Sequence, residues 1–314
     1  MLLVGQGIEG MEIGYLTEVS NIHFGIKLLL LLAITTLLVL FTLTAPLFLW
    51  IIPSVLLGCM FAHAVELQHQ CLHNTAFRST RWNRIVGVLL GMPLLVSFSD
   101  YQNSHMRHHK LLGTPEDKEF FNYGYESLTT VRAFILHLFM PRHYCDVSGF
   151  IGKAIVGRTT REDASPRIAS RIANEYRLMA VFLLALAAIT IAFPSLLTLK
   201  LWLVPFVVGV PVHALIELPE HIGCNTAIPD VLSNTRTIKA SRFGVWFTDG
   251  NNYHVEHHWL PGVPNHNFAK VHRIVNPHGI ANLETSYRSF YLNFLTLLFR
   301  NTLESAGKNR TGSV

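Results

Sequence analysis

Four apolar runs constrain the fold of this 314-residue chain more than any other feature of its sequence. They occupy residues 26–43, 47–64, 178–193 and 199–218. A helix needs roughly 20 mostly apolar residues to cross the hydrocarbon core of a bilayer, and each run is close to that length. Within each pair the break is short, with Pro46 in the first and Pro194 in the second. We therefore expect an all-α integral membrane protein in which four transmembrane helices form two hairpins.

The composition and the distribution of charge agree with a membrane protein. Half of the residues are hydrophobic and only 14% are charged, whereas soluble domains carry about a quarter charged residues. The net charge of +5 could indicate a nucleic-acid partner, but in the four-helix topology every Lys and Arg except Lys200 lies on one side. Basic residues accumulate on the cytoplasmic side of membrane proteins. We therefore predict a multi-pass protein with both termini in the cytosol and no nucleic-acid partner.

The rest of the sequence predicts extramembrane parts around this core. The chain divides into a cytosolic N-terminal segment, a membrane domain and a polar C-terminal tail, at residues 1–25, 26–300 and 301–314. The apolar run 85–98 is too short to span a bilayer and predicts a re-entrant or interfacial helix pair. The polar region 110–177 predicts a cytosolic helical cap with an amphipathic helix around 131–140. The aromatic stretch 287–299 predicts an interfacial segment.

Three clusters of histidines lie at or beyond the predicted cytosolic helix ends. They consist of His69 and His73, of His105, His108 and His109, and of His254, His257 and His258. The spacings H-x-x-x-H and H-x-x-H-H place the rings of one cluster on one helix face, where neighbouring side chains lie about 5–6 Å apart. Neutral imidazole is a common metal ligand. We expect the clusters to meet in one histidine-rich metal site, carried by the cytosolic cap.

The fourth apolar helix adds three candidates at successive steps of four residues, His213, Glu217 and His221. His221 lies where this helix leaves the membrane on the cytosolic side, and we expect it to be a ninth metal ligand. His213 lies two turns deeper, and an ionisable residue within the membrane is a functional candidate by default. Glu217 is a candidate for a direct or water-mediated ligand.

The number of imidazoles indicates two metal ions. A zinc ion usually binds four ligands, whereas eight or nine nitrogens divided between two metals leave room for a small ligand such as dioxygen. Ligand type does not select the metal, because imidazole binds Fe, Cu and Zn. The first cluster reads His69-Gln-Cys-Leu-His73 and so lacks the general base of an H-E-x-x-H hydrolase. We expect redox chemistry at a dimetal centre, with no separate catalytic side chain.

Other polar side chains near the clusters are expected to orient the histidine rings. These acidic and amide residues are Glu66, Asp100, Asn103, Glu217, Glu220, Asp249, Asn252 and Glu256. Isolated histidines are expected to be ordinary core or surface residues, namely His23, His63, His137, His143, His266, His272 and His278.

The three clusters together resemble the histidine boxes of the membrane fatty-acid desaturase superfamily, which have the forms H-x-x-x(-x)-H, H-x-x-H-H and H/Q-x-x-H-H. The surrounding sequences are also similar, namely L-H-N-T-A-F-R (72–78), H-H-K-L-L-G-T-P-E-D (108–117) and N-Y-H-V-E-H-H-W-L-P-G-V-P (252–264). The short first box and the histidine that opens the third box are most similar to the bacterial-type acyl-lipid group.

This resemblance implies a function. It implies two iron ions held by the boxes and by His221, dioxygen as cosubstrate, and a double bond introduced into an acyl chain that is linked to a lipid or a thioester. It also implies an external electron donor of the ferredoxin or cytochrome b5 type with its reductase, since the chain has no flavin, iron–sulfur or heme module. Some members have a water-binding Asn where this chain has Glu217.

Two alternatives stay open at the level of sequence. A hydroxylase or an acetylenase on the same scaffold would carry the same boxes. A metal transporter or a non-catalytic metal-binding membrane protein would hold its ions near the middle of the bilayer. The boxes lie at helix ends instead, and only His213 favours that second alternative.

Overall fold

The computed structural model describes residues 14–311 except 47, 119, 122–126, 159–160, 162, 194–195, 226 and 276–281. The regular secondary structure of the described chain is helical apart from one two-stranded sheet, which confirms the all-α prediction. Four of its helical segments are long and apolar enough to cross a membrane, as the sequence predicts. They are Gly14–Thr44, Ile51–Leu72, Pro166–Ala192 and Leu199–His221.

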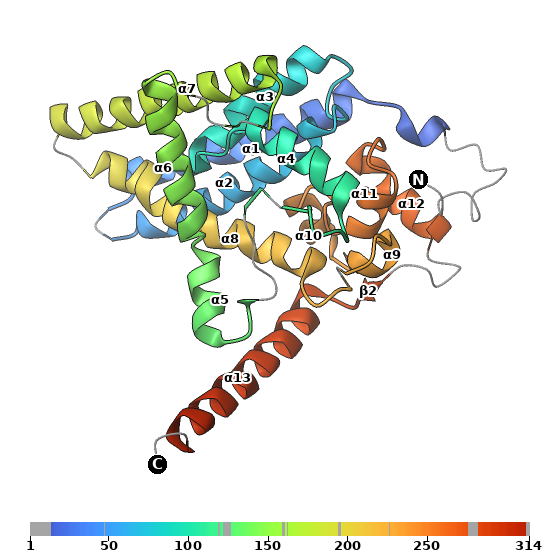
Figure 1. Cartoon of the computed structure of the whole chain (residues 1–314). Coiled ribbons are helices and arrows are strands. Elements are labelled where there is room, and N and C mark those ends of the chain that lie inside the picture. The colour runs from blue at the N-terminus through green and yellow to red at the C-terminus, as the bar shows by residue number, and fades with distance from the viewer. Residues whose placement is uncertain are drawn as a thin grey trace.

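The spanning segments are built from five elements. After a short 3-10 turn, η2 (Gly14–Thr17), the chain forms α1 (Asn21–Thr44), α2 (Ile51–Leu72), α7 (Pro166–Ala192), a π-helical turn η5 (Leu199–Leu203) and α8 (Val204–His221). Helix α2 is central and packs against α1, α3 and α8 (Figure 1). Most of α1 faces outward, because its apolar side chains have no protein partner on that side and suit contact with lipid.

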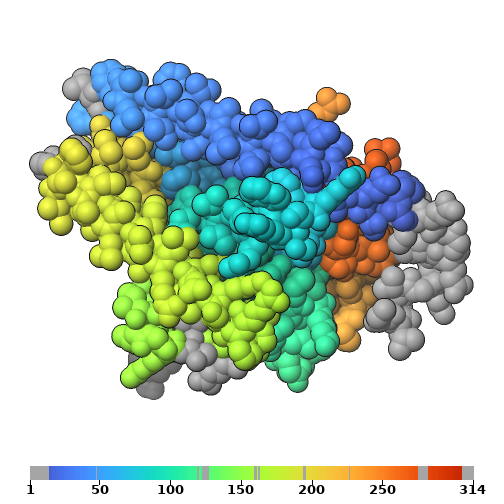
Figure 2. Space-filling view, turned by 90° about the horizontal axis from the view of Figure 1, so that it is seen from above, coloured from blue at the N-terminus to red at the C-terminus, as the bar shows by residue number. Residues whose placement is uncertain are grey.

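The two hairpins have the same orientation. The turns within the two hairpins lie at the same end of the spans. There the ammonium of Lys200 lies 5.1 Å from the centre of the Trp50 ring, and Ser54 donates a hydrogen bond of 2.7 Å to the Lys200 carbonyl. At the other end, Lys27 near the start of α1 forms an ion pair with Asp249 of the C-terminal part. Figure 2 shows both turns at the left end of the molecule and the region of α12 at the right end. The histidine-bearing elements therefore gather at one end of the four spans.

The short apolar run 85–98 contributes to a broken helix pair. Its parts are α3 (Thr80–Gly91), the 3-10 turn η3 (Met92–Leu94) and α4 (Phe98–Leu111), with a bend of 100° between the two arms. The break has a local cause, because Leu95 takes a left-handed conformation with φ of 57° and the Ser97 hydroxyl caps the amide of Asp100. The second arm, α4, carries the second histidine cluster.

Helix α7 starts 12 residues before the predicted run 178–193, at Pro166 rather than 178. Ser165 accepts a hydrogen bond from the amide of Ile168, and Pro166 occupies the first turn, which together form a helix N-terminus. The added turns pack against α4, where Glu175 accepts hydrogen bonds from the hydroxyls of Ser97 and Ser99. Hydropathy detects only the apolar part of such a helix.

The remaining elements are not among the candidate spans. They are α5 (Val131–Leu138), α6 (Pro141–Ile155), α9 (Val231–Asn234), β1 (Thr237–Ile238), α10 (Arg242–Phe247), α11 (His254–Trp259), η6 (Asn265–Asn267), α12 (Phe268–Val275), β2 (Leu283–Glu284) and α13 (Tyr287–Thr311). Strands β1 and β2 pair in parallel, and Thr237 also bridges Tyr253 just before α11. Helix α13 extends away from the body in Figure 1 and is not among the candidate spans. The interfacial location of 287–299 stays a prediction.

Candidate metal centre

Four helices present histidines to one region of the molecule. Helix α2 ends with His69 and His73 at its C-terminus, α4 carries the second cluster, α8 ends on His221, and α11 is a single short helix formed around the third cluster. The structure brings together all nine histidines for which the sequence predicts metal binding. Six of the isolated histidines belong to none of the metal-ligand groups that the described residues form, and His278 lies outside the described residues.

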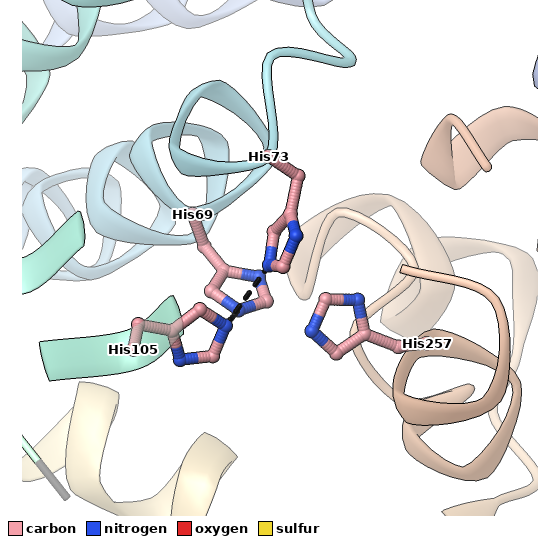
Figure 3. Close-up of side chains that lie close together, drawn as sticks. All are labelled: His69, His73, His105 and His257. Carbon is pink, nitrogen blue, oxygen red and sulfur yellow. Dashed lines mark hydrogen bonds between the residues drawn. The ribbon is translucent and has the colours of Figure 1, made fainter. Parts of the chain in front are cut away.

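The first group consists of His69, His73, His105 and His257 (Figure 3). The four rings come from three helices and point toward one another. The Nε2 atom of His105 lies 2.8 Å from Nε2 of His69 and 3.0 Å from Nε2 of His73. One ring nitrogen from each member lies within 4.8 Å of the others, so a single ion could bind all four.

The second group consists of His108, His221 and His258. Nε2 of His221 lies 3.2 Å from Nε2 of His108 and 2.9 Å from Nε2 of His254, so His254 joins this group. His109 lies between the two groups, with its Nε2 atom 2.9 Å from that of His257. The nine side chains thus form two adjacent sets of nitrogen donors, with His109 between them.

The electrostatics of these sets suit cation binding. Burial lowers the pKa of His254, His257 and His258 well below the usual value, so their rings are neutral at neutral pH. The His258 side chain is buried, and neither of its ring nitrogens has a hydrogen-bond partner. A buried polar atom without a partner is destabilising by about 1–3 kcal/mol. A metal ion bound at Nε2 of His258 would give that nitrogen a partner, so the donor set fits metal binding.

Several rings are held in place through their other nitrogen. Nδ1 of His69 lies 3.0 Å from Oδ1 of Asn251, and Nδ1 of His221 lies 2.9 Å from the carbonyl of Asn234. Such contacts fix the tautomer and present Nε2 as the metal-binding nitrogen. The sequence gives no signal for Asn251 or Asn234, because each lies far along the chain from the ring that it holds.

Carboxylates lie beside two further rings. Nδ1 of His108 lies 3.0 and 3.1 Å from the two oxygens of Asp117, and Nδ1 of His254 lies 3.3 Å from Oε2 of Glu220. Glu220 is among the residues predicted for this role. Asp117 is not, although it ends the 108–117 segment next to the second box.

The other predicted orienting residues take different positions. Glu66 accepts a hydrogen bond of 2.6 Å from Asn251, which in turn contacts His69. Asp249 pairs with Lys27. The remaining bonds are from Arg161 to Asp100, from Asn252 to the Ile238 carbonyl and from Thr237 to Glu256. These contacts hold the elements together around the centre.

His213 and Glu217 form a separate group with Glu66 rather than with the box histidines. Nδ1 of His213 lies 3.1 Å from Oε1 of Glu66, and its Nε2 atom lies 3.5 Å from Oε1 of Glu217. The Tyr101 hydroxyl donates a hydrogen bond of 3.0 Å to the same Glu217 oxygen. This group lies beside a cavity at the metal centre, which both Tyr101 and Glu217 line.

Comparison with known proteins identifies the relatives of the chain. The family model for fatty acid desaturases matches residues 44–291. The dihydrorhizobitoxine desaturase of Bradyrhizobium elkanii is 24% identical over 257 residues, which are 77% of this chain and 73% of that protein. The endoplasmic reticulum omega-6 fatty acid desaturase isozyme 1 of Glycine max is 36% identical over 73 residues, which are 23% of this chain and 19% of that protein.

The family match covers the helices that carry all three histidine boxes and His221. The same helices bring the nine rings together in two sets in the structure. The chain, a membrane-embedded oxidoreductase, therefore belongs to the fatty acid desaturase family.

Proposed function

We propose that this protein is an oxygen-dependent di-iron desaturase that introduces a double bond into an acyl chain, linked to a lipid or a thioester. The observation that carries the proposal is the convergence of nine buried or half-buried histidines from four helices in a chain of the desaturase family. An all-imidazole set with a small adjacent cavity suits an ion that must also accept a further ligand.

The two sets of histidines would each hold one iron ion. When bound, the iron pair supplies the redox chemistry that activates dioxygen and removes hydrogen from an unreactive C–H bond. The protein keeps the rings neutral by burial and orients them through Asn251, Asn234 and Asp117. The chain thus contributes ligands and their orientation, and no side chain is assigned a proton-transfer role.

The cavity beside the histidines would receive the part of the substrate that reacts. Its walls include Tyr101, Phe120 and Phe121, and the Tyr101 ring packs against both phenylalanine rings. Holding a substrate carbon close to the reacting centre and excluding water is the protein's main contribution to the rate. The position of the double bond would follow from which carbon this cavity holds.

Electrons would come from an external donor of the ferredoxin or cytochrome b5 type with its reductase. A basic groove next to the first two boxes supports this proposal. It is lined by Arg81, Arg84, Arg167 and Arg171, and no Asp or Glu is among the described residues that line it. Gln102 also lines the groove and donates a hydrogen bond to the carbonyl of Leu72, the residue before His73. An acidic donor bound there would lie one layer of residues from the metal ligands.

The experiment is product analysis in a host that supplies donor proteins, with the His257→Ala variant as control. Extracted lipids and thioesters are compared by mass spectrometry. We expect a product lighter by two hydrogens that the variant does not form. A product heavier by one oxygen atom would instead establish a hydroxylase, and a purified protein that contains zinc or no metal would contradict the oxidative function. Purified protein should form product only with added donor, and less of it at high salt.

A further inference from the structure

We propose that α10 is embedded in the lipid leaflet on the histidine-bearing side of the membrane. Phe243 contacts acyl chains there, and His63 of α2 is the hydrogen-bond partner of the last carbonyl of α10. This location is independent of the reaction that the protein catalyses. Three observations support it, namely the depth of α10 along α2, the pairing of its carbonyls and the exposed aromatic side chain that it presents.

The contacts of α2 give the two ends of the apolar layer. The turns at Trp50 and Lys200 mark one end of the spans. Lys27 of α1 marks the other end, since its ammonium lies 3.3 Å from Oε1 of Gln70. From Trp50 to Gln70, α2 rises by about 30 Å, which is the thickness of the hydrocarbon core of a bilayer. His63 precedes Gln70 by about two helical turns and therefore lies about 10 Å inside that boundary.

The C-terminal end of α10 lies at the level of His63. The His63 side chain is fully buried, and its Nδ1 atom lies 2.8 Å from the carbonyl oxygen of Phe247. Its ring also packs against the ring of Trp246, with 4.5 Å between the centres. Helix α10 has six residues and is too short to span a bilayer. It therefore lies within the apolar layer without crossing it.

The chain enters and leaves this layer on the same side. Before α10, the Ile238 amide donates a hydrogen bond of 2.8 Å to the carbonyl of Asn252, which lies after α10 next to the third histidine cluster. Asp249, two residues after the helix, pairs with Lys27 at the boundary. Helix α10 is thus the inner part of a loop whose two ends are joined to each other near the metal centre.

The carbonyls at the end of α10 all have partners within the protein. Backbone amides of the following turn donate hydrogen bonds to the carbonyls of Gly244, Val245 and Trp246. The carbonyl oxygen of Phe247 can only accept, so Nδ1 of His63 donates to it. The last carbonyls of a helix lack partners within the helix, and water usually hydrates them. Hydrocarbon offers no donor, so the paired end of α10 suits a location in lipid.

The side chains of α10 fit the boundary of a bilayer. Phe243 is 67% exposed, and its ring stacks on that of Phe247 with 5.8 Å between the centres. Lys239 and Arg242, at the start of the loop, are also exposed, and α10 contains no acidic residue. Basic side chains beside exposed aromatic ones are typical of helices that lie in a membrane surface with anionic lipids. The composition of α10 therefore agrees with its depth.

Fluorescence quenching of the full-length, metal-loaded protein in lipid nanodiscs tests this location. A Phe243→Cys variant in a Cys145→Ser background is labelled with bimane maleimide, and the signal of the background protein is subtracted. The nanodiscs contain phosphatidylcholine and phosphatidylglycerol, with or without brominated acyl chains. Leu32→Cys, exposed on α1 at a similar depth, is the control for lipid. Asp163→Cys, at a surface ion pair, is the control for water.

We expect brominated lipid to quench the label at Phe243 as strongly as the label at Leu32. Iodide should quench it at most about a fifth as strongly as the label at Asp163, because hydrocarbon excludes the anion. Quenching by iodide as strong as at Asp163 would overturn the proposal. A label that neither quencher reaches would overturn it as well, since protein, such as a second copy of this chain, would then cover α10.

The His63→Phe variant tests the hydrogen bond to α10. It keeps an aromatic ring against Trp246 and removes the donor to the Phe247 carbonyl. An unpaired carbonyl is unfavourable in hydrocarbon, so we expect iodide quenching of the label at Phe243 to rise at least about twofold. The label at Leu32 should keep its value in the same variant. Unchanged quenching at Phe243 would contradict the role of His63 in holding α10 within the leaflet.

Discussion

Asp117 holds the His108 ring through both carboxylate oxygens, at 3.0 and 3.1 Å from Nδ1. The charge of Asp117 strengthens the electron donation of His108 toward a metal ion at Nε2. Asp117→Asn keeps the shape and one acceptor but removes that charge. Changes of such orienting partners typically weaken metal binding by about 10–100-fold. We expect a loss of this size for one of the two proposed iron ions, measured by competition with a chelator.

Asp163→Asn is the matched control, because Asp163 also pairs with a basic side chain, Arg107, but lies on the surface. Surface ion pairs contribute little, so this variant should bind iron as the wild type does. Equal iron affinity of the Asp117 variant and this control would show that Asp117 does not support the metal centre.

For single residues, the sequence predicts which histidines gather at the metal centre, but not most of the polar groups that hold their rings. Helical spacing brings His105, His108 and His109 onto one face whatever the tertiary structure. The contact between His69 and Asn251 spans 182 positions in the sequence, and no local pattern indicates it. The grouping of His213 with Glu66, across 147 positions, is likewise a product of helix packing. Tertiary contacts between polar residues are therefore the part of the site that requires a structure.

Close packing of α2 and α8 sets the distance between the first box and His221. Gly58 of α2 makes this possible, since a Cβ atom there would lie 2.6 Å from the carbonyl oxygen of Pro205 and 2.8 Å from Cβ of Val208. Small residues allow such close approach of membrane helices. We expect Gly58→Ala to lower the free energy of unfolding by about 1–3 kcal/mol. Titration with a denaturing detergent, followed by circular dichroism, measures this change.

Gly25→Ala in α1 is the control, because a Cβ atom at Gly25 would have no neighbour within 4 Å. Alanine forms helix more readily than glycine, so this variant should be as stable as the wild type or more stable, by up to about 1 kcal/mol. If the two variants unfold at the same detergent concentration, α2 and α8 do not depend on Gly58 for their packing.

Apolar length predicts which elements exist, and local capping determines where they end. The run 26–43 lies inside α1, and the second run is continued by box residues to Leu72 as the periodicity predicts. Hydropathy does not detect the polar start of α7, because this part packs through polar contacts with Ser97 and Ser99 at the start of α4. The turn at Leu95 escapes it as well, since nothing in an apolar run indicates a left-handed residue.

The whole molecule has one end rich in histidine and charge and another end of short turns between spans. We propose that the histidine-bearing end faces the cytosol, because all Lys and Arg except Lys200 belong to that side of the four-span topology. The four natural cysteines are not in disulfides, and Cys145 in α6 is the exposed one among them. In the four-span topology Cys145 lies between the second and third spans, on the same side as the histidine clusters, so its labelling reports the sidedness of that region.

A membrane-impermeant maleimide added to intact cells should leave the wild-type protein unlabelled and should label Cys145 once the membrane is opened. The reverse is expected for a variant that combines Cys145→Ser with Phe48→Cys, since Phe48 lies in the turn between the first two spans and is 78% exposed. Labelling of Cys145 from outside intact cells would invert the topology. It would also place the metal centre and the basic groove on the side away from cytosolic electron donors. The orientation of the chain therefore decides which donors can reach the groove.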